Sequence, residues 1–216
     1  AYTQAKHPGG GSGKLHFSSG NATWKNANGD DVVNAGGQNF DGVNDNITFG
    51  TDASIDGFTT KSYAFWFQSD SATTNFFLFG KDAAFSEWHI RIDDSDSDHL
   101  NISQDFTTTD GEVSGSTTIG TTLFYHVTFA HDGTTASPTL WLNGVAETLS
   151  GWAPSGTIVS DAASTLRMGT NSGDAQDFDG RMGWLTYVNA VWTAAEMNRH
   201  RWWGCAPGGP STVAVW

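Results

Sequence analysis

The chain has 216 residues, which fits one large domain or two small ones. Charged residues make up 15% of it, whereas about 25% is typical of globular domains, and the formal net charge is -13. Phosphate backbones and anionic lipids repel such an acidic chain, so we expect no nucleic-acid partner and no membrane partner. No apolar run approaches the roughly 20 residues that a membrane-spanning helix requires.

The acidic residues are mostly of one kind, since 19 are Asp and four are Glu. Asp is favoured in turns, while Glu is favoured in helices. Aromatic residues reach 13%, and there are 26 Gly. This composition predicts a folded chain with many strands and turns. It leaves open whether the Asp residues bind a metal or only form turns.

The two ends of the chain differ from the middle. Residues 1–38 are predicted to form a Gly-rich arm, and residues 204–216 to form a tail that contains the Pro- and Gly-rich stretch 205–210. The single cysteine, Cys205, excludes an internal disulfide. Residues 1–4 show no basic stretch leading into an apolar one, so we expect no signal peptide and synthesis in the cytoplasm.

Residues 39–203 alternate between strand and turn patterns. In 87–92, Trp88 and Ile90 face one way while His89 and Arg91 face the other. One helix is predicted from the capping box Thr193-Ala194-Ala195-Glu196 to about residue 201. Short strands at this spacing predict an all-β antiparallel sandwich or jelly roll. The further predicted strands are residues 63–67, 76–79, 125–130, 140–142, 166–168 and 183–189. Strand 140–142 leads into the predicted hairpin turn Asn143-Gly144.

Five short motifs occur in a fixed order along this region. They are Phe40-Asp41-Gly42-Val43-Asn44-Asp45, Tyr125-His126-Val127 with Asp132-Gly133-Thr134, Leu140-Trp141-Leu142-Asn143-Gly144-Val145, Leu166-Arg167-Met168-Gly169-Thr170-Asn171-Ser172-Gly173, and Phe178-Asp179-Gly180. With them the chain resembles the laminin-G-like, concanavalin A-like jelly-roll superfamily over roughly residues 39–203. The resemblance implies a two-sheet antiparallel jelly-roll sandwich with one short C-terminal helix. Similar stand-alone modules occur among the structural proteins of tailed bacteriophages.

That superfamily includes glucanases, so a catalytic carboxylate pair is the first chemistry to test. Retaining glycosidases need two carboxyl groups about 5–5.5 Å apart. In this fold they usually lie at alternate positions of one strand. The four Glu, which are Glu87, Glu112, Glu147 and Glu196, are scattered, and none stands in the Glu-x-Asp-x-Glu pattern of such a strand. We therefore expect that the protein is not an enzyme.

Calcium is the one cofactor that stays open. Asp94-Ser95-Asp96-Ser97-Asp98 has acids at alternate positions, but it lacks the Gly and Glu of an EF-hand loop, so a polar hairpin tip is favoured. The resemblance implies a structural calcium site with Asp41, Asp45 and Asp179 as ligands. Where relatives commonly have Asp-Glu on the late strand, this chain has Gly183-Trp184, which leaves such a site short of a ligand unless Asp179 or backbone carbonyls substitute.

Sugar binding is the remaining candidate chemistry. Trp88 and Trp141 are candidate faces on which a sugar ring stacks, with His89 and Arg91 as polar neighbours. The alternative is that these Trp side chains pack in the core or cover the ends of the sandwich.

Two functional hypotheses follow. The first is a non-catalytic virion structural protein, a capsid decoration or fibre component on the virion surface that is made in the host cytoplasm. Its partners would be other virion proteins and copies of itself. The second is a carbohydrate-binding lectin module for host glycans, which would be secreted or at a cell surface. In the first hypothesis the assembly contacts come from the arm and the tail, through His7, Pro8, Lys14, Trp202, Trp203 and Trp216.

Overall fold

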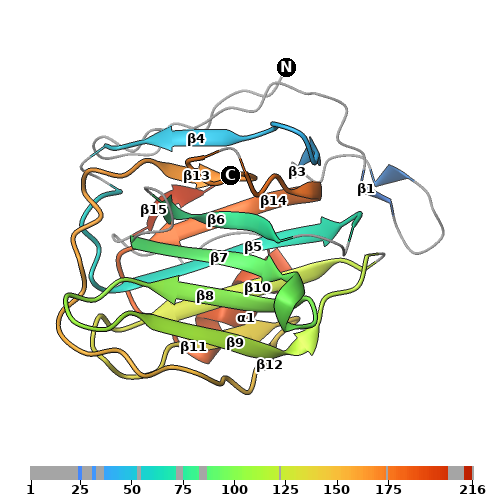
Figure 1. Ribbon diagram of the computed structural model, residues 1–216. Coiled ribbons are helices and arrows are strands. Elements are labelled where there is room, and N and C mark those ends of the chain that lie inside the picture. The colour runs from blue at the N-terminus through green and yellow to red at the C-terminus, as the bar shows by residue number, and fades with distance from the viewer. Residues whose placement is uncertain are drawn as a thin grey trace.

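The computed structural model describes residues 24–25, 31–32, 37–52, 55–71, 75–82, 87–121, 123–173, 175–203 and 212–215. In this part of the chain two antiparallel sheets stack face to face, and a helix lies on the outer side of one of them (Figure 1). The predicted all-β jelly-roll sandwich with a short C-terminal helix is confirmed. None of the described helices is long and apolar enough to cross a membrane.

The sheet that carries the helix is named here the β5 sheet. Both β3 and β15 pair with the edge of β14 that β5 leaves open. Its strands, in order, are β12 (Val145–Ala146), β11 (Thr139–Leu142), β10 (Tyr125–His131), β5 (Lys61–Ser69) and β14 (Asp179–Val188), followed by β3 (Gly37–Asp41) and β15 (Thr212–Val215).

The second sheet, named here the β7 sheet, lies toward the viewer in Figure 1. A short 3-10 helix, η1 (Asp94–Asp96), forms the turn between its strands β7 and β8. Separately, β1 (Trp24–Lys25) pairs with β2 (Asp31–Val32). The strands of the β7 sheet, in order, are β4 (Ile47–Gly50), β13 (Leu166–Met168), β6 (Phe76–Asp82), β7 (Glu87–Asp93), β8 (His99–Gln104) and β9 (Gly111–Thr118).

Aromatic side chains fill the space between the two sheets. Tyr63 of β5 stacks on Phe129 with ring centroids 4.7 Å apart, and on Trp88 of the opposite sheet at 5.6 Å. Trp88 also packs against Tyr187 at 5.4 Å. All four rings are buried. Since burying one large apolar side chain contributes roughly 1.5–3 kcal/mol, this group is a main source of cohesion between the sheets.

The helix α1 (Ala194–Trp203) begins at the predicted capping box. The Glu196 carboxylate accepts a hydrogen bond from the Thr193 N–H at 2.7 Å, and the Glu196 N–H donates to the Thr193 hydroxyl at 3.4 Å. Met197 of this helix packs with Ala64 and Val188 on the outer face of the β5 sheet. The apolar run 63–67 is therefore covered on both faces, as expected for a continuously apolar strand.

Two buried histidines join α1 to the sheet beneath it. His126 Nε2 of β10 lies 2.8 Å from His200 Nδ1 of α1, and His200 Nε2 lies 2.9 Å from the Thr186 hydroxyl. Burial, together with the neighbouring charges of His200 and Arg201, holds the pKa of His126 far below its usual value. Burial also lowers the pKa of His200, to about 4. Both rings are therefore neutral at pH 7.

The segment between β12 and β13 lies along the outer edge of β9. Ser114 and Ser150 exchange backbone hydrogen bonds of 3.0 and 3.1 Å, and isolated bridges join Thr109 to Ser155 and Phe106 to Ile158. The first contact lies on the edge of β9 that β8 leaves open, and the other two continue along the residues before β9. They also hold residues 150 and 151 beside the outer face of the β7 sheet.

Parts of the predicted arm and of the predicted tail form strands of the β5 sheet. Gly37 and Gln38 of the predicted arm belong to β3, and residues 212–215 of the predicted tail form β15. Both strands pair with β14, so these parts of the arm and the tail lie in a sheet of their own domain. The division of the chain at residues 38 and 203 stays a prediction.

We predict that the protein loses stability as the pH falls from 6.5 to about 4. His126 and His200 accept protons in the unfolded chain near pH 6.5, but in the folded chain only at much lower pH. Stability from this pair is therefore full above pH 6.5 and declines below it. Thermal melts at pH 7.5 and 4.5 measure the loss. A His126→Gln/His200→Gln variant should show a smaller difference between the two melting temperatures, and an unchanged difference would contradict this assignment.

Candidate functional site

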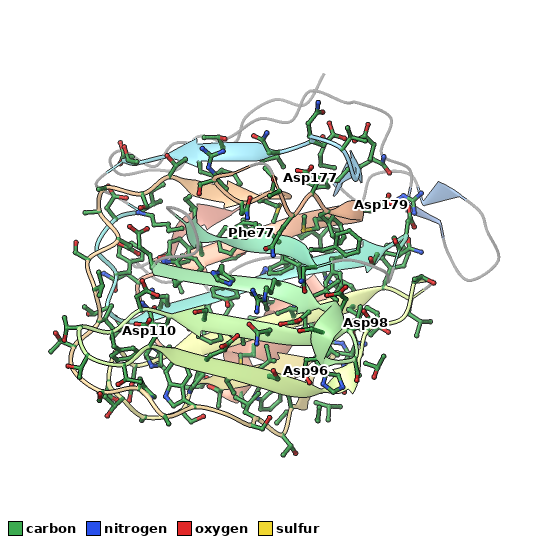
Figure 2. All side chains as sticks on the ribbon, viewed as in Figure 1. Phe77, Asp96, Asp98, Asp110, Asp177 and Asp179 are labelled. Carbon is green, nitrogen blue, oxygen red and sulfur yellow. The ribbon has the colours of Figure 1, made fainter. Side chains whose placement is uncertain are left out.

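A polar groove of about 350 Å³ lies on the outer side of the β7 sheet, near the turn between β7 and β8. Figure 2 shows Asp96 and Asp98 at this turn, beside the ends of β8 and β9. We name it the Asn101 groove. Its lining residues are Asp93, Asp96, Asn101, Glu112, Val113, Ser114, Ser150 and Gly151.

Strand alternation brings the polar residues of the groove together. Arg91 of β7 pairs in register with Asn101 of β8, and Asn101 pairs with Ser114 of β9. Residues directly opposite one another on neighbouring strands face the same side of a sheet. The neighbours of Asn101 in sequence, Leu100 and Ile102, are buried in the core, so the Asn101 side chain lies on the outer face.

Arg91 links two carboxylates at the groove. Its Nη2 donates to Asp93 Oδ2 at 2.8 Å and to Glu112 Oε1 at 3.2 Å. Burial alone would raise the pKa of Asp93, but the hydrogen bonds from Ser95 and the charge of Arg91 outweigh it, and the pKa is lowered. Asp93 therefore stays ionised at neutral pH. Glu112 has a side chain that is 59% exposed, so one acid of this pair is open to solvent.

Two polar atoms at the groove are buried without a hydrogen-bond partner in the described part of the chain. Asn101 is only 3% exposed, and its Nδ2 donates to the Ser114 hydroxyl at 3.3 Å, while its Oδ1 has no partner. Arg91 Nε is likewise without one. A buried polar atom without a partner costs about 1–3 kcal/mol. A ligand that hydrogen-bonds to these atoms would recover that free energy.

The donor and acceptor set of the groove suits a ligand rich in hydroxyl groups. Carboxylate and amide oxygens accept from hydroxyls, whereas the hydroxyls of Ser114 and Ser150 can donate to them. The lining residues include no aromatic side chain, so recognition here would depend on hydrogen bonds rather than on ring stacking.

The structure separates the four predicted sugar-binding residues. Trp88 as a stacking face is wrong, because its ring is 2% exposed and lies between the sheets, with its indole N–H donating to Asp161. Trp141 packs against the apolar cluster on the outer face of the β5 sheet, on the opposite side of the sandwich. His89 is buried on the same side of β7 as Arg91. Only Arg91 contacts residues of the groove.

Sequence reasoning missed Asn101, Glu112 and Ser114. A signal was present, since polar residues alternate with apolar ones along β8 at His99, Asn101 and Ser103. The sequence did not show that β8 lies between β7 and β9, and this neighbourhood is what converts the alternation into a groove.

Two of the predicted calcium ligands face each other. Asp41 of β3 pairs in register with Asp179 of β14, and the Asp45 carboxylate accepts from the Asp41 N–H at 3.0 Å. Burial, and then the charges of Asp70 and Asp41, raise the pKa of Asp179. The acids are therefore close enough to repel one another. In the described residues, however, no group of three or more acidic, His or Cys side chains is arranged to hold a metal ion.

The acidic stretch after β7 forms a turn, as the sequence favours, and not an EF-hand loop. Residues 94–96 form η1, and Asp93 caps this turn by accepting from the Ser95 N–H at 3.0 Å. The stretch is thus a polar hairpin tip between β7 and β8. The hairpin turn predicted at Asn143-Gly144 is also confirmed, with positive φ angles of 53° and 79°.

The residues predicted to make assembly contacts are not placed by the structure. His7, Pro8, Lys14 and Trp216 lie outside the described residues. Trp202 and Trp203 end α1, and their side chains lie outside the described part as well. Their role in assembly stays a prediction.

One family model matches most of the chain. Residues 41–198 match the model of the concanavalin A-like lectin/glucanases superfamily. The chain belongs to this superfamily. No curated protein sequence matches it.

Solved structures show the same fold at low sequence identity. A protein from Bacteroides ovatus assigned as carbohydrate-binding has a TM-score of 0.62 at 16% identity over 82% of this chain and 50% of its own. A heptameric SAP-like pentraxin from Limulus polyphemus has a TM-score of 0.61 at 14% identity over 82% and 86%. The binding domain of Paraclostridial Mosquitocidal Protein 1 has 0.57 at 14% over 77% and 45%. This chain thus spans half or less of the first and third of these structures.

The acids at the β3–β14 pair give a prediction for calcium. In a buffer with a chelator, Asp179→Asn should melt at or above the wild-type temperature at pH 7, because it removes repulsion from Asp41 and Asp70. If these acids hold calcium, millimolar calcium raises the melting temperature of the wild type but not of Asp179→Asn. Equal wild-type melts with calcium and with chelator would contradict the predicted calcium site.

Proposed function

We propose that the protein is a non-catalytic module that binds carbohydrate, and that its binding site is the Asn101 groove. The observation that carries the proposal is the buried Asn101 Oδ1, which has no hydrogen-bond partner among the described residues while its residue lines an open polar groove. Ligand sites in proteins use a few fixed polar groups of this kind to orient the ligand. Sugar hydroxyls supply both donors and acceptors for them.

The charges at the groove support binding rather than hydrolysis. A glycosidase needs one carboxyl group that stays protonated to act as an acid. Here the guanidinium of Arg91 lies between Asp93 and Glu112, and the pKa of Asp93 is lowered. Such a carboxylate accepts hydrogen bonds and does not donate protons. Solved structures of the same fold include a protein assigned as carbohydrate-binding and the binding domain of a toxin, which is consistent with this proposal.

A glycan array probed with the purified protein is the test, and we expect a defined group of sugars to bind. For the best sugar, Asn101→Ala should weaken binding by roughly tenfold or more, since losing one buried hydrogen bond costs about 1–3 kcal/mol. Glu112→Gln should weaken it as well, because an amide accepts less strongly than a carboxylate.

The matched control is Asn44→Ala, which changes an exposed Asn in the turn between β3 and β4. It should bind as the wild type does. Circular dichroism shows whether each variant is folded. Unchanged affinity in both groove variants, with sugar still bound, would place the binding site elsewhere.

A second proposal concerns the larger assembly to which the protein belongs. A decoration or fibre component on the exterior of a virus particle fits the Gly-rich composition of residues 1–38 and the net charge of -13, which would keep many copies apart. Its partners would be other virion proteins and copies of itself, and the protein would be made in the host cytoplasm. The groove would then bind host glycans. A lectin without such a role would be secreted or held at a cell surface.

Truncation tests the second proposal. Removing residues 1–20, which include the predicted contacts His7, Pro8 and Lys14, or residues 205–216, which include Trp216, should abolish attachment to particles or self-association. The second deletion also removes β15 from the β5 sheet. Ultracentrifugation and binding to particles measure the loss, and near-ultraviolet circular dichroism checks that the sandwich is still folded. Normal assembly of both truncated proteins would refute the role of the arm and the tail.

A further inference from the structure

A cluster of charged side chains lies inside the sandwich, at the end of β7 away from the Asn101 groove. Lys81 of β6 and Lys61 of β5 are 0% and 1% exposed, and Asp161, which precedes β13, is 3% exposed. Taking such charges out of water costs several kcal/mol for each ion unless the partners are well placed. Carbohydrate binding at the groove makes no use of them.

The Lys81 amine is held by two acidic residues. Its Nζ donates to the Asp56 carboxylate and to the backbone carbonyl of Asp161, the latter at 3.3 Å, and it lies 3.9 Å from Asp161 Oδ1. The Lys81 side chain is fully buried, and the Asp56 side chain is 12% exposed. The amine and the Asp56 carboxyl group thus face each other with little access for water.

Asp161 is hydrogen-bonded both to the loop that carries Asp56 and to the aromatic core beside Lys81. Its Oδ1 accepts from the N–H of Gly57, the residue after Asp56, at 2.7 Å, and its Oδ2 accepts from the Trp88 indole at 2.8 Å. The first bond holds the loop that carries Asp56 in place. The second anchors the Asp161 carboxylate on the aromatic core, next to the Lys81 amine.

Apolar side chains flank the pair. Ile55 and Phe58, on either side of the Asp56-Gly57 pair, are each 7% exposed, and Leu166 pairs in register with Lys81 and is fully buried. The contact is largely closed to water, which disfavours hydrolysis of an amide formed there. A neutral amine held against a carboxyl group is also at a very high effective concentration.

We propose that Lys81 and Asp56 are joined by an isopeptide bond that forms within the folded protein. The neutral Nζ attacks the carboxyl carbon of protonated Asp56, and a C–N bond forms. Asp161 accepts a proton from the nitrogen and returns it to the departing hydroxyl, the C–O bond breaks, and one water leaves. Atoms and charges balance without an oxidant or a nucleotide. Two buried charges are replaced by one neutral amide, which is less costly to bury.

Lys61 provides a matched control. It is equally buried, and burial lowers its pKa to about 7, so a large share of its amine is neutral. Its Nζ donates to the amide oxygen of Gln104 at 2.8 Å and lies 4.6 Å from the centre of the Trp88 ring. Its bonded partner is therefore an amide and not a carboxyl group, and we expect no cross-link from it.

The intact mass of the full chain tests the proposal. We expect a mass lower than that of the sequence by one water, about 18 Da, and a branched peptide that contains both Asp56 and Lys81 after digestion. Lys81→Arg should restore the full mass and lower the melting temperature. Lys61→Arg should keep the loss of one water. A wild-type chain of full sequence mass overturns the proposal.

A second dehydration must be separated from this one. Asp56-Gly57 is a dipeptide that can close to a succinimide, which also loses one water. That product would persist in Lys81→Arg and would react with hydroxylamine, so either result overturns the isopeptide bond. Asp161→Asn, incubated and sampled over time, should form the cross-link more slowly. Formation at the wild-type rate would remove Asp161 from the reaction.

Discussion

The alternation of side chains along β7 is the constraint on which both the groove and the buried charge cluster depend. Trp88 and Ile90 point into the core, where Trp88 stacks on Tyr63 of the opposite sheet. A shift of one residue would place His89 and Arg91 among aromatic rings and move Trp88 into solvent. The core therefore fixes the register of β7, and the register decides which polar groups lie on each side.

One strand thus serves two chemically different environments. On the inner side, Trp88 holds Asp161 through its indole and so positions the acid beside Lys81. On the outer side, Arg91 holds Asp93 and Glu112 at the Asn101 groove. The first environment excludes water, which favours neutral groups, and the second is open to it, which favours ion pairs. The two can change independently, since the rigid strand separates them.

Much of the fold was predictable from the sequence, because its signals are local. The alternation in residues 87–92, the hairpin turn at Asn143-Gly144 and the capping box at Thr193 each depend on neighbouring residues, and each is present in the structure. The Asp residues at 94–98 form the polar hairpin tip that their sequence favours. The scarcity of Glu correctly indicated few helices.

The candidate site was predicted poorly, because it depends on which strands are neighbours. Trp88 looks the same in sequence whether it faces a sugar or Tyr63, and only the pairing of sheets decides between them. Asn101 and Ser114 are 13 residues apart and meet through the register of β8 and β9. Lys81 and Asp56 likewise meet only in three dimensions, from a strand and a loop 25 residues apart.

The segment that covers the edge of β9 limits how a partner can approach the groove. Its Ser150 exchanges backbone hydrogen bonds with Ser114 of β9, and its Glu147 carboxylate accepts from the N–H groups of Ser116 and Thr117, so these groups are not free for an added strand. Recognition beside the groove therefore falls to side chains. A ligand-binding surface of this kind can change its specificity by substitution at Asn101, Glu112 or Ser150 while the hydrogen bonding of the sheet stays the same.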